Sequence, residues 1–270
     1  MENILDEIEK IGIVPVIVID DEKDAVPLAK ALCEGGLPAA EVTFRTAAAK
    51  ASIAAMRKAC PDMVVGAGTV LTVAQADEAL EAGAQFIVSP GFDEAVVKHC
   101  IEKNVPVLPG CATPSEVGRA VALGLKKVKF FPAEQAGGLA MIKAMAAPFV
   151  GVRFMPTGGL NAKNIGAYLE ANEIIACGGS FMVKKDLIAK GDFESIRRMT
   201  EEAVQIMTTM TFVSCDNGVS TFSVKCPERA VYHMGRKGMD FDEKSAVYKA
   251  DKLMSIVSAD GRTKLVRTGA

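Results

Sequence analysis

The sequence lacks the residue patterns that build a metal centre or a set of disulfides. It has only two histidines, His99 and His233, and neither lies near a partner at metal-ligand spacing. We therefore expect no bound metal and no catalytic zinc. The seven cysteines are scattered and form no Cys-x-x-Cys pair, which predicts reduced, mostly buried thiols in a cytoplasmic protein.

The chain also lacks an excess of charge and a long apolar run. Lys and Arg number 31 against 33 Asp and Glu, and no basic stripe is present, so we expect no nucleic-acid partner. No uninterrupted apolar stretch approaches the ~20 residues needed to span a bilayer. The first ten residues are acidic and amphipathic, unlike a signal peptide, in which a basic segment precedes an apolar run. These features predict a globular protein without a membrane partner.

From Gly12 to about Met207 the chain repeats one rhythm, in which a short β-branched run is followed by a break and a helical stretch. The predicted strands are 13–19, 40–45, 63–67, 86–89, 105–108, 128–131, 152–155 and 174–177. The predicted helices are 24–33, 47–59, 73–82, 93–103, 114–122, 139–146, 164–171 and 193–207. Because the strands are nearly continuous apolar runs, they indicate a parallel sheet that is buried on both faces.

Two observations favour a (β/α)8 TIM barrel over an open doubly wound sheet. The repeating units number eight, and the polar residues follow the strand ends. A dinucleotide-binding sheet would carry Gly-x-Gly-x-x-Gly after its first strand, but the first strand leads directly into Asp21 and Glu22. Gly66-Ala67-Gly68 lacks a third glycine, so we exclude that cofactor site as well.

Beyond Met207 the rhythm stops, which predicts two domains, 1–207 and 208–270. The second is expected to be a small α+β module with the order strand, helix and three strands. The predicted strands are 219–224, near 239–241, 252–257 and 263–267, and the predicted helix is 227–237.

Lys129 lies inside a predicted buried strand, where its ammonium group would lose water at a large cost. One interpretation is structural: the side chain reaches the rim, or pairs with a glutamate. The other is functional, because burial favours the neutral amine, which is a nucleophile.

Glu41, Thr43 and Arg45 share one face of the second predicted strand, which we expect to be the barrel interior. A buried Glu–Arg ion pair is the structural interpretation. The functional one is that Glu41 transfers protons while Arg45 holds a substrate carboxylate in a bidentate contact.

Glycine pairs follow the last two predicted strands, in PTGG (156–159) and GGS (178–180). In (β/α)8 enzymes the loops after these strands commonly bind phosphate through backbone N–H groups. A single glycine pair is more often a tight turn, but two pairs at these strand ends favour a phosphate site.

These segments, with four others, resemble the 2-keto-3-deoxy-6-phosphogluconate (KDPG) and 4-hydroxy-2-oxoglutarate (KHG) aldolase family. The motifs in order are EVTFRT, GAGTVLT, SPGF, PGCATPSE, KFFPAE, PTGG and GGS, within residues 5–207. The resemblance implies that Lys129 forms a Schiff base, without a cofactor, and that Glu41 transfers protons. It implies that the substrate-binding residues are Arg45, Thr69, Pro90, Phe131, Thr157, Gly158, Gly159, Gly178, Gly179 and Ser180.

The resemblance also implies a small 2-keto acid substrate and a homotrimer. The sequence does not rank KDPG, its C4 epimer and KHG. Two alternatives stay open: another phosphosugar barrel enzyme, such as an epimerase, and a non-catalytic oligomeric scaffold. Residues 208–270 resemble half of a glyoxalase/vicinal-oxygen-chelate domain, in which His233 is expected on the helix and therefore not as a metal ligand.

Overall fold

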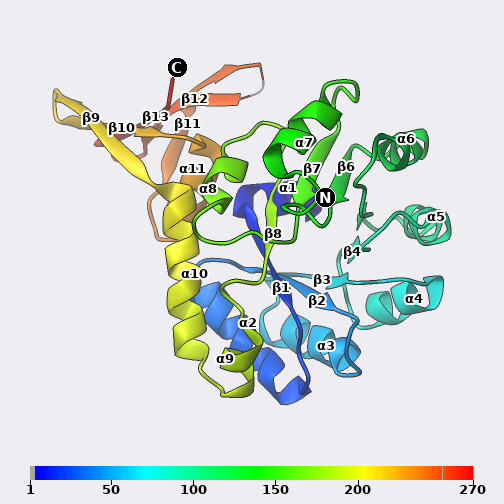
Figure 1. The fold of residues 1–270 in the computed structure, drawn as a ribbon. Helices are drawn as coiled ribbons and strands as arrows, with labels where there is room; N and C mark the ends of the chain where they lie inside the picture. The colour runs from blue at the N-terminus through cyan, green and yellow to red at the C-terminus, as the bar shows by residue number, and fades with distance from the viewer. Residues whose placement is uncertain (1–3, 251, 270) are drawn as a thin grey trace. The chain divides into compact units, whose positions relative to one another are not determined.

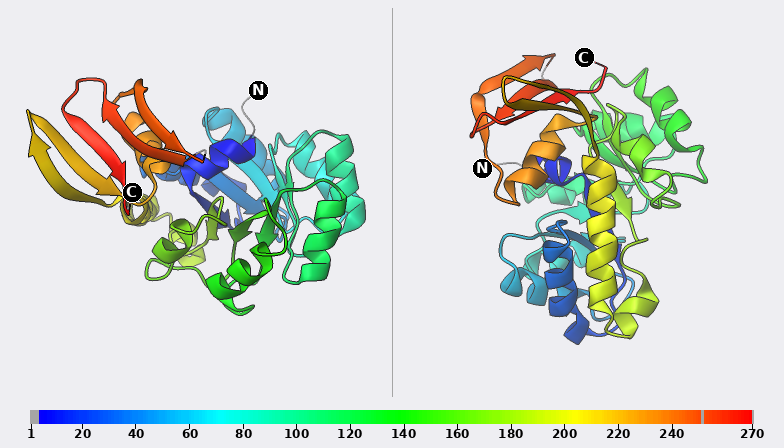
Figure 2. Two further views of the ribbon diagram at one scale, coloured as in Figure 1. Left: turned by 90° about the horizontal axis from the view of Figure 1, so that it is seen from above. Right: turned by 90° about the vertical axis from the view of Figure 1, so that its left-hand side faces the viewer.

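The computed structural model describes residues 4–250 and 252–269, and it divides into two compact units, Met1–Thr200 and Glu201–Ala270. The larger unit alternates strand and helix (Figures 1 and 2). Its strands are β1 (Ile13–Ile17), β2 (Ala39–Thr43), β3 (Val64–Gly68), β4 (Ile87–Val88), β5 (Val107–Leu108), β6 (Lys127–Phe130), β7 (Arg153–Pro156) and β8 (Cys177–Gly179). Its helices are α1 (Ile4–Ile11), η1 (Glu22–Asp24), α2 (Ala25–Glu34), α3 (Ala49–Ala59), α4 (Val73–Glu81), α5 (Glu94–Glu102), α6 (Pro114–Ala122), α7 (Gly138–Ala146), α8 (Ile165–Leu169), α9 (Lys185–Ala189) and the first part of α10 (Phe193–Thr208).

The strands of the larger unit close into a ring. A parallel sheet has the order β5-β4-β3-β2-β1-β8, and β6 pairs with β7. The bridge between Gly110 and Lys129 joins the end of β5 to β6, and the bridge between Thr157 and Gly178 joins the end of β7 to β8. Every strand therefore has two neighbours, and the expected (β/α)8 barrel is confirmed. Because helices cover the outside, β1, β2 and β3 are buried at every residue.

Several helices of the larger unit begin at residues whose side chains cap the helix N-terminus. The Thr72 side chain accepts a hydrogen bond from the backbone N–H of Gln75. Asp192 accepts one from Ser195 in the first turn of α10. At α6, Thr113 and Glu116 form a capping box with proline at the first helical turn. These bonds satisfy backbone donors that a helix start leaves without partners.

The observed strands are shorter than predicted at β4 and β5, and the sequence prediction missed two helices. One is α1, whose Ile8 and Ile11 are fully buried, and the other is the five-residue α9. The division between the units falls within α10, whereas the sequence places the boundary after Met207. The domain boundary at 207 stays a prediction.

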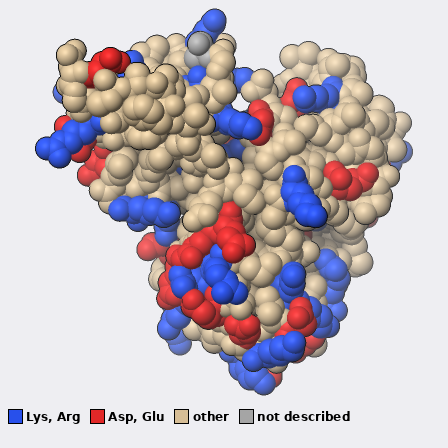
Figure 3. All heavy atoms as spheres, turned by 60° about the vertical axis from the view of Figure 1, so that its left-hand side comes forward, with Lys and Arg blue, Asp and Glu red and all other residues tan. Residues whose placement is uncertain are grey.

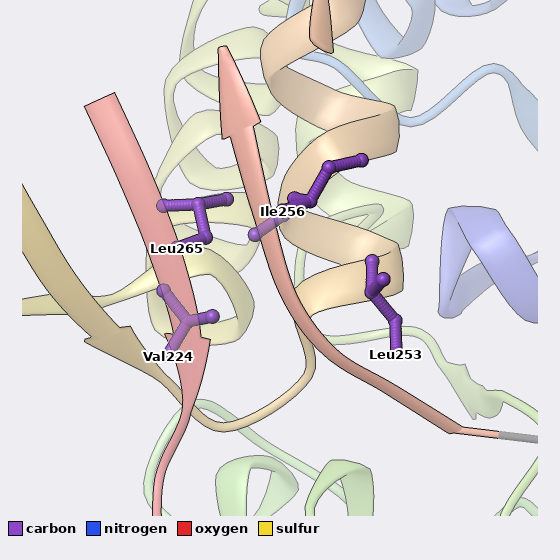
Figure 4. Close-up of a cluster of buried hydrophobic side chains, with 5 residues drawn as sticks. Val224, Leu253, Ile256 and Leu265 are labelled. Carbon is purple, nitrogen blue, oxygen red and sulfur yellow. The ribbon is translucent and has the colours of Figure 1, made fainter. Parts of the chain in front are cut away.

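The C-terminal unit contains β9 (Met210–Asp216), β10 (Val219–Val224), α11 (Pro227–Gly235), β11 (Phe241–Lys249), β12 (Lys252–Ser258) and β13 (Thr263–Arg267). Its sheet has the order β11-β12-β13-β10-β9. Buried side chains from β10, α11, β12 and β13 form its core: Val224, Ala230, Leu253, Ile256 and Leu265 (Figure 4).

The predicted order of a strand, a helix and three strands is present from β10 to β13, and β9, which the sequence prediction did not include, precedes it. Strands β9 and β10 form an antiparallel hairpin around Asn217 and Gly218, which both have positive φ angles. The strand predicted near 239–241 is misplaced, since β11 covers Phe241–Lys249. His233 lies on α11, as expected.

Among the described residues, no helix is long and apolar enough to cross a membrane. On the face that Figure 3 shows, Lys and Arg side chains alternate with Asp and Glu side chains, and no patch of a single sign stands out. This distribution agrees with the formal net charge of −2.

Candidate active site

A buried lysine and a buried glutamate meet in the barrel interior. Lys129 lies on β6 and Glu41 on β2, and these two strands stand on opposite sides of the ring. The Lys129 Nζ atom donates a hydrogen bond to Glu41 Oε1 at 3.2 Å. Only 5% of Lys129 and 1% of Glu41 is exposed. Burying two ionisable groups costs several kcal/mol of folding free energy, which only their pairing offsets. Stability alone therefore does not account for a lysine and a glutamate at these positions.

Two buried oxygen atoms at the site have no hydrogen-bond partner among the described residues. They are Glu41 Oε2 and Thr157 Oγ1. Thr157 directly follows β7 and is 7% exposed. Because buried polar groups in folded proteins almost always have partners, unpartnered oxygens mark positions where water or a substrate group binds.

Arg45 and Thr69 meet at the ends of neighbouring strands, β2 and β3. Arg45 is exposed, and its Nε donates to Thr69 Oγ1 at 3.2 Å. Because this bond uses Nε, it leaves the terminal nitrogens of the guanidinium group to contact a carboxylate. Thr69 has a φ of +56°, a strained conformation for a β-branched residue, and such strain is concentrated at functional sites. Glu41 pairs with Lys129 and not with Arg45, so the structural Glu–Arg pair considered from the sequence is not formed.

Phe131 and Pro90 follow β6 and β4, and both are half-buried. The Phe131 ring centroid lies 5.3 Å from Lys129 Nζ, close enough for a cation–π contact when the amine is charged. Beside Pro90, Gly110 allows a close backbone approach, because an added Cβ atom would lie 2.1 Å from the Pro90 carbonyl oxygen. Gly110 thus lets the ends of β4 and β5 come together at the site.

The predicted phosphate-binding residues follow β7 and β8. Gly158 and Gly159 have φ angles of +102° and +78°, which L side chains rarely adopt. Gly178 and Gly179 end β8, and Ser180 follows them as an exposed residue. The structure brings these two segments together through the Thr157–Gly178 bridge.

The ten expected binding residues and the two catalytic ones thus fall at six strand ends or inside β2 and β6. Direct contacts join Lys129 to Glu41 and to Phe131, Arg45 to Thr69, and Thr157 to Gly178. Within the described residues, Lys129 makes no hydrogen bond to Pro90, Gly158, Gly159, Gly179 or Ser180.

The structure adds Tyr168 and Glu134 to the surroundings of the site. Tyr168 on α8 donates a hydrogen bond to the Glu134 carboxylate, and burial, followed by this bond, raises the pKa of Tyr168 well above its ordinary value. The backbone N–H of Glu134 donates to the Gly158 carbonyl at 3.1 Å. An added Cβ atom at Gly159 would lie 2.6 Å from Glu134 Cβ. This pair therefore holds the loop after β6 against the loop after β7, a relation that the KFFPAE motif alone does not reveal.

Gly68 is a further residue that the sequence prediction missed, because its motif was considered as a cofactor loop, which was excluded, and as a family motif that assigns a role only to Thr69. An added Cβ atom there would lie 2.2 Å from Glu41 Oε1. The available signal was a glycine inside a buried strand, which often marks a close approach by another group.

Neither histidine belongs to this site. His99 Nε2 lies 2.7 Å from Asp77 Oδ1, a contact between α5 and α4. Within residues 4–250 and 252–269, no three His, Cys, Asp or Glu side chains are grouped as metal ligands would be. A hollow bordered by Lys143, Val150 and Glu173 lies before β7 and β8, away from the strand ends that carry the site.

Comparisons with known proteins agree on one relationship for the barrel. A family model described as KDPG and KHG aldolase matches residues 4–199. The 2-dehydro-3-deoxy-phosphogluconate aldolase of Treponema pallidum (strain Nichols) is 48% identical over 210 residues, which cover 78% of this chain and 100% of that protein.

Two similar solved structures include a small molecule. The KDPG aldolase of Zymomonas mobilis ZM4 with 3-phosphoglycerate is 43% identical, with a TM-score of 0.70, and the match covers 74% of this chain and 94% of that chain. The KDPG aldolase of Legionella pneumophila, with pyruvate captured at low pH as a covalent carbinolamine intermediate, is 36% identical, with a TM-score of 0.71. That match covers 74% of this chain and 97% of the Legionella chain.

Proposed function

This chain belongs to the KDPG and KHG aldolase family, and we propose that it cleaves 2-keto-3-deoxy-6-phosphogluconate through an imine on Lys129. The membership confirms the resemblance carried by the seven motifs and makes the chain a class I aldolase, a carbon–carbon lyase. The observation that carries the proposal is the pair of Lys129 and Glu41, enclosed in the barrel at 3.2 Å. The carbinolamine captured in the Legionella relative supports covalent chemistry of this kind.

The reaction follows from the chemistry of a buried amine. Neutral Lys129 Nζ adds to the C2 carbonyl of the substrate to give a carbinolamine, and loss of water leaves a protonated imine. The C3–C4 bond then breaks, its electron pair passes into the enamine, and the C4 hydroxyl proton passes to the Glu41 carboxylate, which releases the aldehyde. Glu41 returns a proton to C3, and hydrolysis releases pyruvate and the lysine amine. A positioned acid/base group of this kind contributes ~10²–10⁴-fold.

The remaining residues bind the substrate. We assign the pyruvyl carboxylate to Arg45 and Thr69, whose mutual hydrogen bond orients the guanidinium group. Phe131 and Pro90 line the apolar side, and Thr157 contacts the substrate near the reacting carbons through its unpartnered hydroxyl. The phosphate is assigned to Gly158, Gly159, Gly178, Gly179 and Ser180, at the strand ends where barrel enzymes commonly bind phosphate.

The products of KDPG cleavage are pyruvate and glyceraldehyde 3-phosphate. We also include KHG as a substrate, which gives pyruvate and glyoxylate, and the C4 epimer of KDPG remains a third candidate. The chemistry requires no cofactor besides the imine. We further propose a cytoplasmic homotrimer. The likeness of residues 208–270 to half of a vicinal-oxygen-chelate domain stays a prediction. We propose a structural role for this segment.

Borohydride trapping with pyruvate tests the proposal. We expect reduction to attach the pyruvyl group to Lys129, as located by peptide mass mapping. The matched control is Lys127→Met, on the same strand, because Lys127 is tied to Asp6 at 2.7 Å and Glu9 at 3.5 Å and should not affect the trapping. Lys129→Met should abolish it. If folded wild-type protein gives no adduct, the imine mechanism is wrong, and the result favours the epimerase and scaffold alternatives.

A further inference from the structure

Gly68 ends β3 beside the acid/base pair, and its missing side chain leaves the space that Glu41 occupies. An added Cβ atom would lie 2.2 Å from Glu41 Oε1, 2.6 Å from its Cγ and 2.8 Å from its Cδ. All three nearest atoms thus belong to a single side chain. The φ angle of Gly68 is outside the left-handed region, so alanine is compatible with the backbone. Space, and not conformational freedom, therefore requires glycine at this position.

Glu41 has little freedom to move away from such an intruding atom. Its side chain is 1% exposed, and its Oε1 accepts the hydrogen bond from Lys129 Nζ. A displaced carboxyl group would lose this bond or push into the packed barrel, since protein interiors have almost no spare volume. The position of the unpartnered Oε2 atom would change with it.

We propose that Gly68 is a positioning residue of the aldol reaction, acting through Glu41. Because Gly68 has no Cβ atom, the Glu41 carboxyl group can occupy the position from which it delivers a proton to C3 of the enamine. In that step the C3–H bond forms with the enamine electron pair, the Glu41 O–H bond breaks, and the imine is regenerated. The inference rests on the proposed function, because it requires the Lys129 imine.

The test compares two measurements on Gly68→Ala in the full-length protein. Borohydride trapping with pyruvate reports imine formation, and NMR in deuterium oxide reports exchange of the pyruvate methyl protons, which requires proton transfer at C3. We expect exchange to fall by about 10²-fold or more, the contribution of a positioned acid/base group. Trapping should change by only a few-fold. Equal losses in both measurements would overturn the proposal.

Gly66→Ala is the matched control on the same strand. An added Cβ atom there would lie 2.4 Å from the ring of Phe86. The steric clash is therefore similar, but it involves an apolar core residue. We expect a lower free energy of unfolding and an unchanged ratio of exchange to trapping. A selective loss of exchange in Gly66→Ala would contradict the proposal, because general strain in β3 would then explain both variants.

A Glu41→Ala background separates action through Glu41 from any other route. In that background Gly68→Ala should leave the residual exchange unchanged, because the displaced group is already gone. A further loss there would overturn the proposal. If Gly68→Ala alone does not fold, Glu41→Ala/Gly68→Ala should fold, and failure of this double variant would refute the spatial argument. Failure of the proposed function is distinct, because wild-type protein would then show neither trapping nor exchange.

Discussion

The two units each contain a pair of oppositely charged residues, and the pairs differ in burial and in how many hydrogen bonds the carboxylate accepts. The side chains of Lys129 and Glu41 are buried, whereas 18% of the Arg267 side chain and 36% of the Glu228 side chain is exposed. In the C-terminal unit, both Glu228 carboxylate oxygens accept from Arg267 Nη2, at 2.6 and 2.7 Å, and Oε1 also accepts from the backbone N–H of Leu253. In the barrel, Glu41 accepts one bond from Lys129, and its Oε2 has no partner among the described residues. The first pair ties α11 to β12 and β13, whereas the second retains capacity for a substrate.

The electrostatics of Glu228 follow from this complete bonding. Burial alone would raise the pKa of Glu228, but backbone N–H groups of Glu228 and Leu253 and the Arg267 charge together lower it below the ordinary value of 4.5. A carboxylate held in this way stabilises the fold while it is ionised. The comparison shows that a pair with all its hydrogen bonds made contributes stability, whereas a buried pair that keeps an unpartnered oxygen inside the barrel indicates chemistry.

The largest effect is expected from breaking the barrel pair. Lys129→Met should reduce KDPG cleavage by on the order of 10⁴-fold or more, since removal of a covalent nucleophile leaves only binding contributions. The rate is measured by coupling pyruvate release to lactate dehydrogenase. The double variant Lys129→Met/Glu41→Leu should be as inactive as Lys129→Met. Its free energy of unfolding should exceed that of the wild type by about 1–4 kcal/mol, because apolar groups replace a buried ion pair. Retained cleavage in Lys129→Met would contradict the assignment.

The next effect should appear in stability and not in catalysis. Arg267→Met leaves the Glu228 carboxylate without its main partner and should lower the free energy of unfolding of the C-terminal unit by about 1–3 kcal/mol. Peptide-resolved hydrogen exchange over β12 and β13 measures this change. Lys264→Met, on the same strand, is the control. KDPG cleavage should stay within twofold of wild type, and a large loss of activity would show that the C-terminal pair serves the site.

The pH dependence of the stability of the C-terminal unit tests the role of the Glu228–Arg267 pair. Because the pKa of Glu228 is lower in the folded state, its stabilising contribution is present above about pH 4.5 and is lost as the pH falls through the folded value. Protection of the C-terminal unit against hydrogen exchange, corrected for intrinsic rates, should therefore fall below that pH. Glu228→Gln should flatten this dependence. An identical decline in the variant would assign the acid sensitivity to other carboxylates.

The barrel could be predicted because its local signals agree with its global arrangement. Parallel strands covered by helices require apolar runs such as residues 13–17, and caps such as Thr113 mark the helix starts. Strand β9 was missed because most of its residues are exposed and give no alternating pattern. The signal that predicts it is Asn217-Gly218, a dipeptide typical of a tight hairpin turn.

The candidate site shows the same limit. The presence of charged residues in predicted buried strands is sufficient to nominate Lys129, Glu41 and Arg45. Their pairing is not predictable from spacing, because it depends on β2 and β6 standing on opposite sides of a closed ring. The space that Gly68 leaves for Glu41 likewise depends on the register between β2 and β3.

The smallest expected effect tests whether a saturated polar group inside the barrel unit also acts on stability alone. The Thr113 hydroxyl accepts from the Glu116 backbone N–H at 3.4 Å, and the Glu116 carboxylate accepts from the Thr113 backbone N–H at 2.9 Å. Thr113→Ala should cost about 1 kcal/mol, the typical value for an N-cap, whereas Thr113→Ser should be nearly neutral. Urea denaturation measures both, and cleavage rates should be unchanged. If Thr113→Ala instead impaired cleavage without loss of stability, saturation of hydrogen bonds would no longer distinguish structural from functional polar groups in this protein.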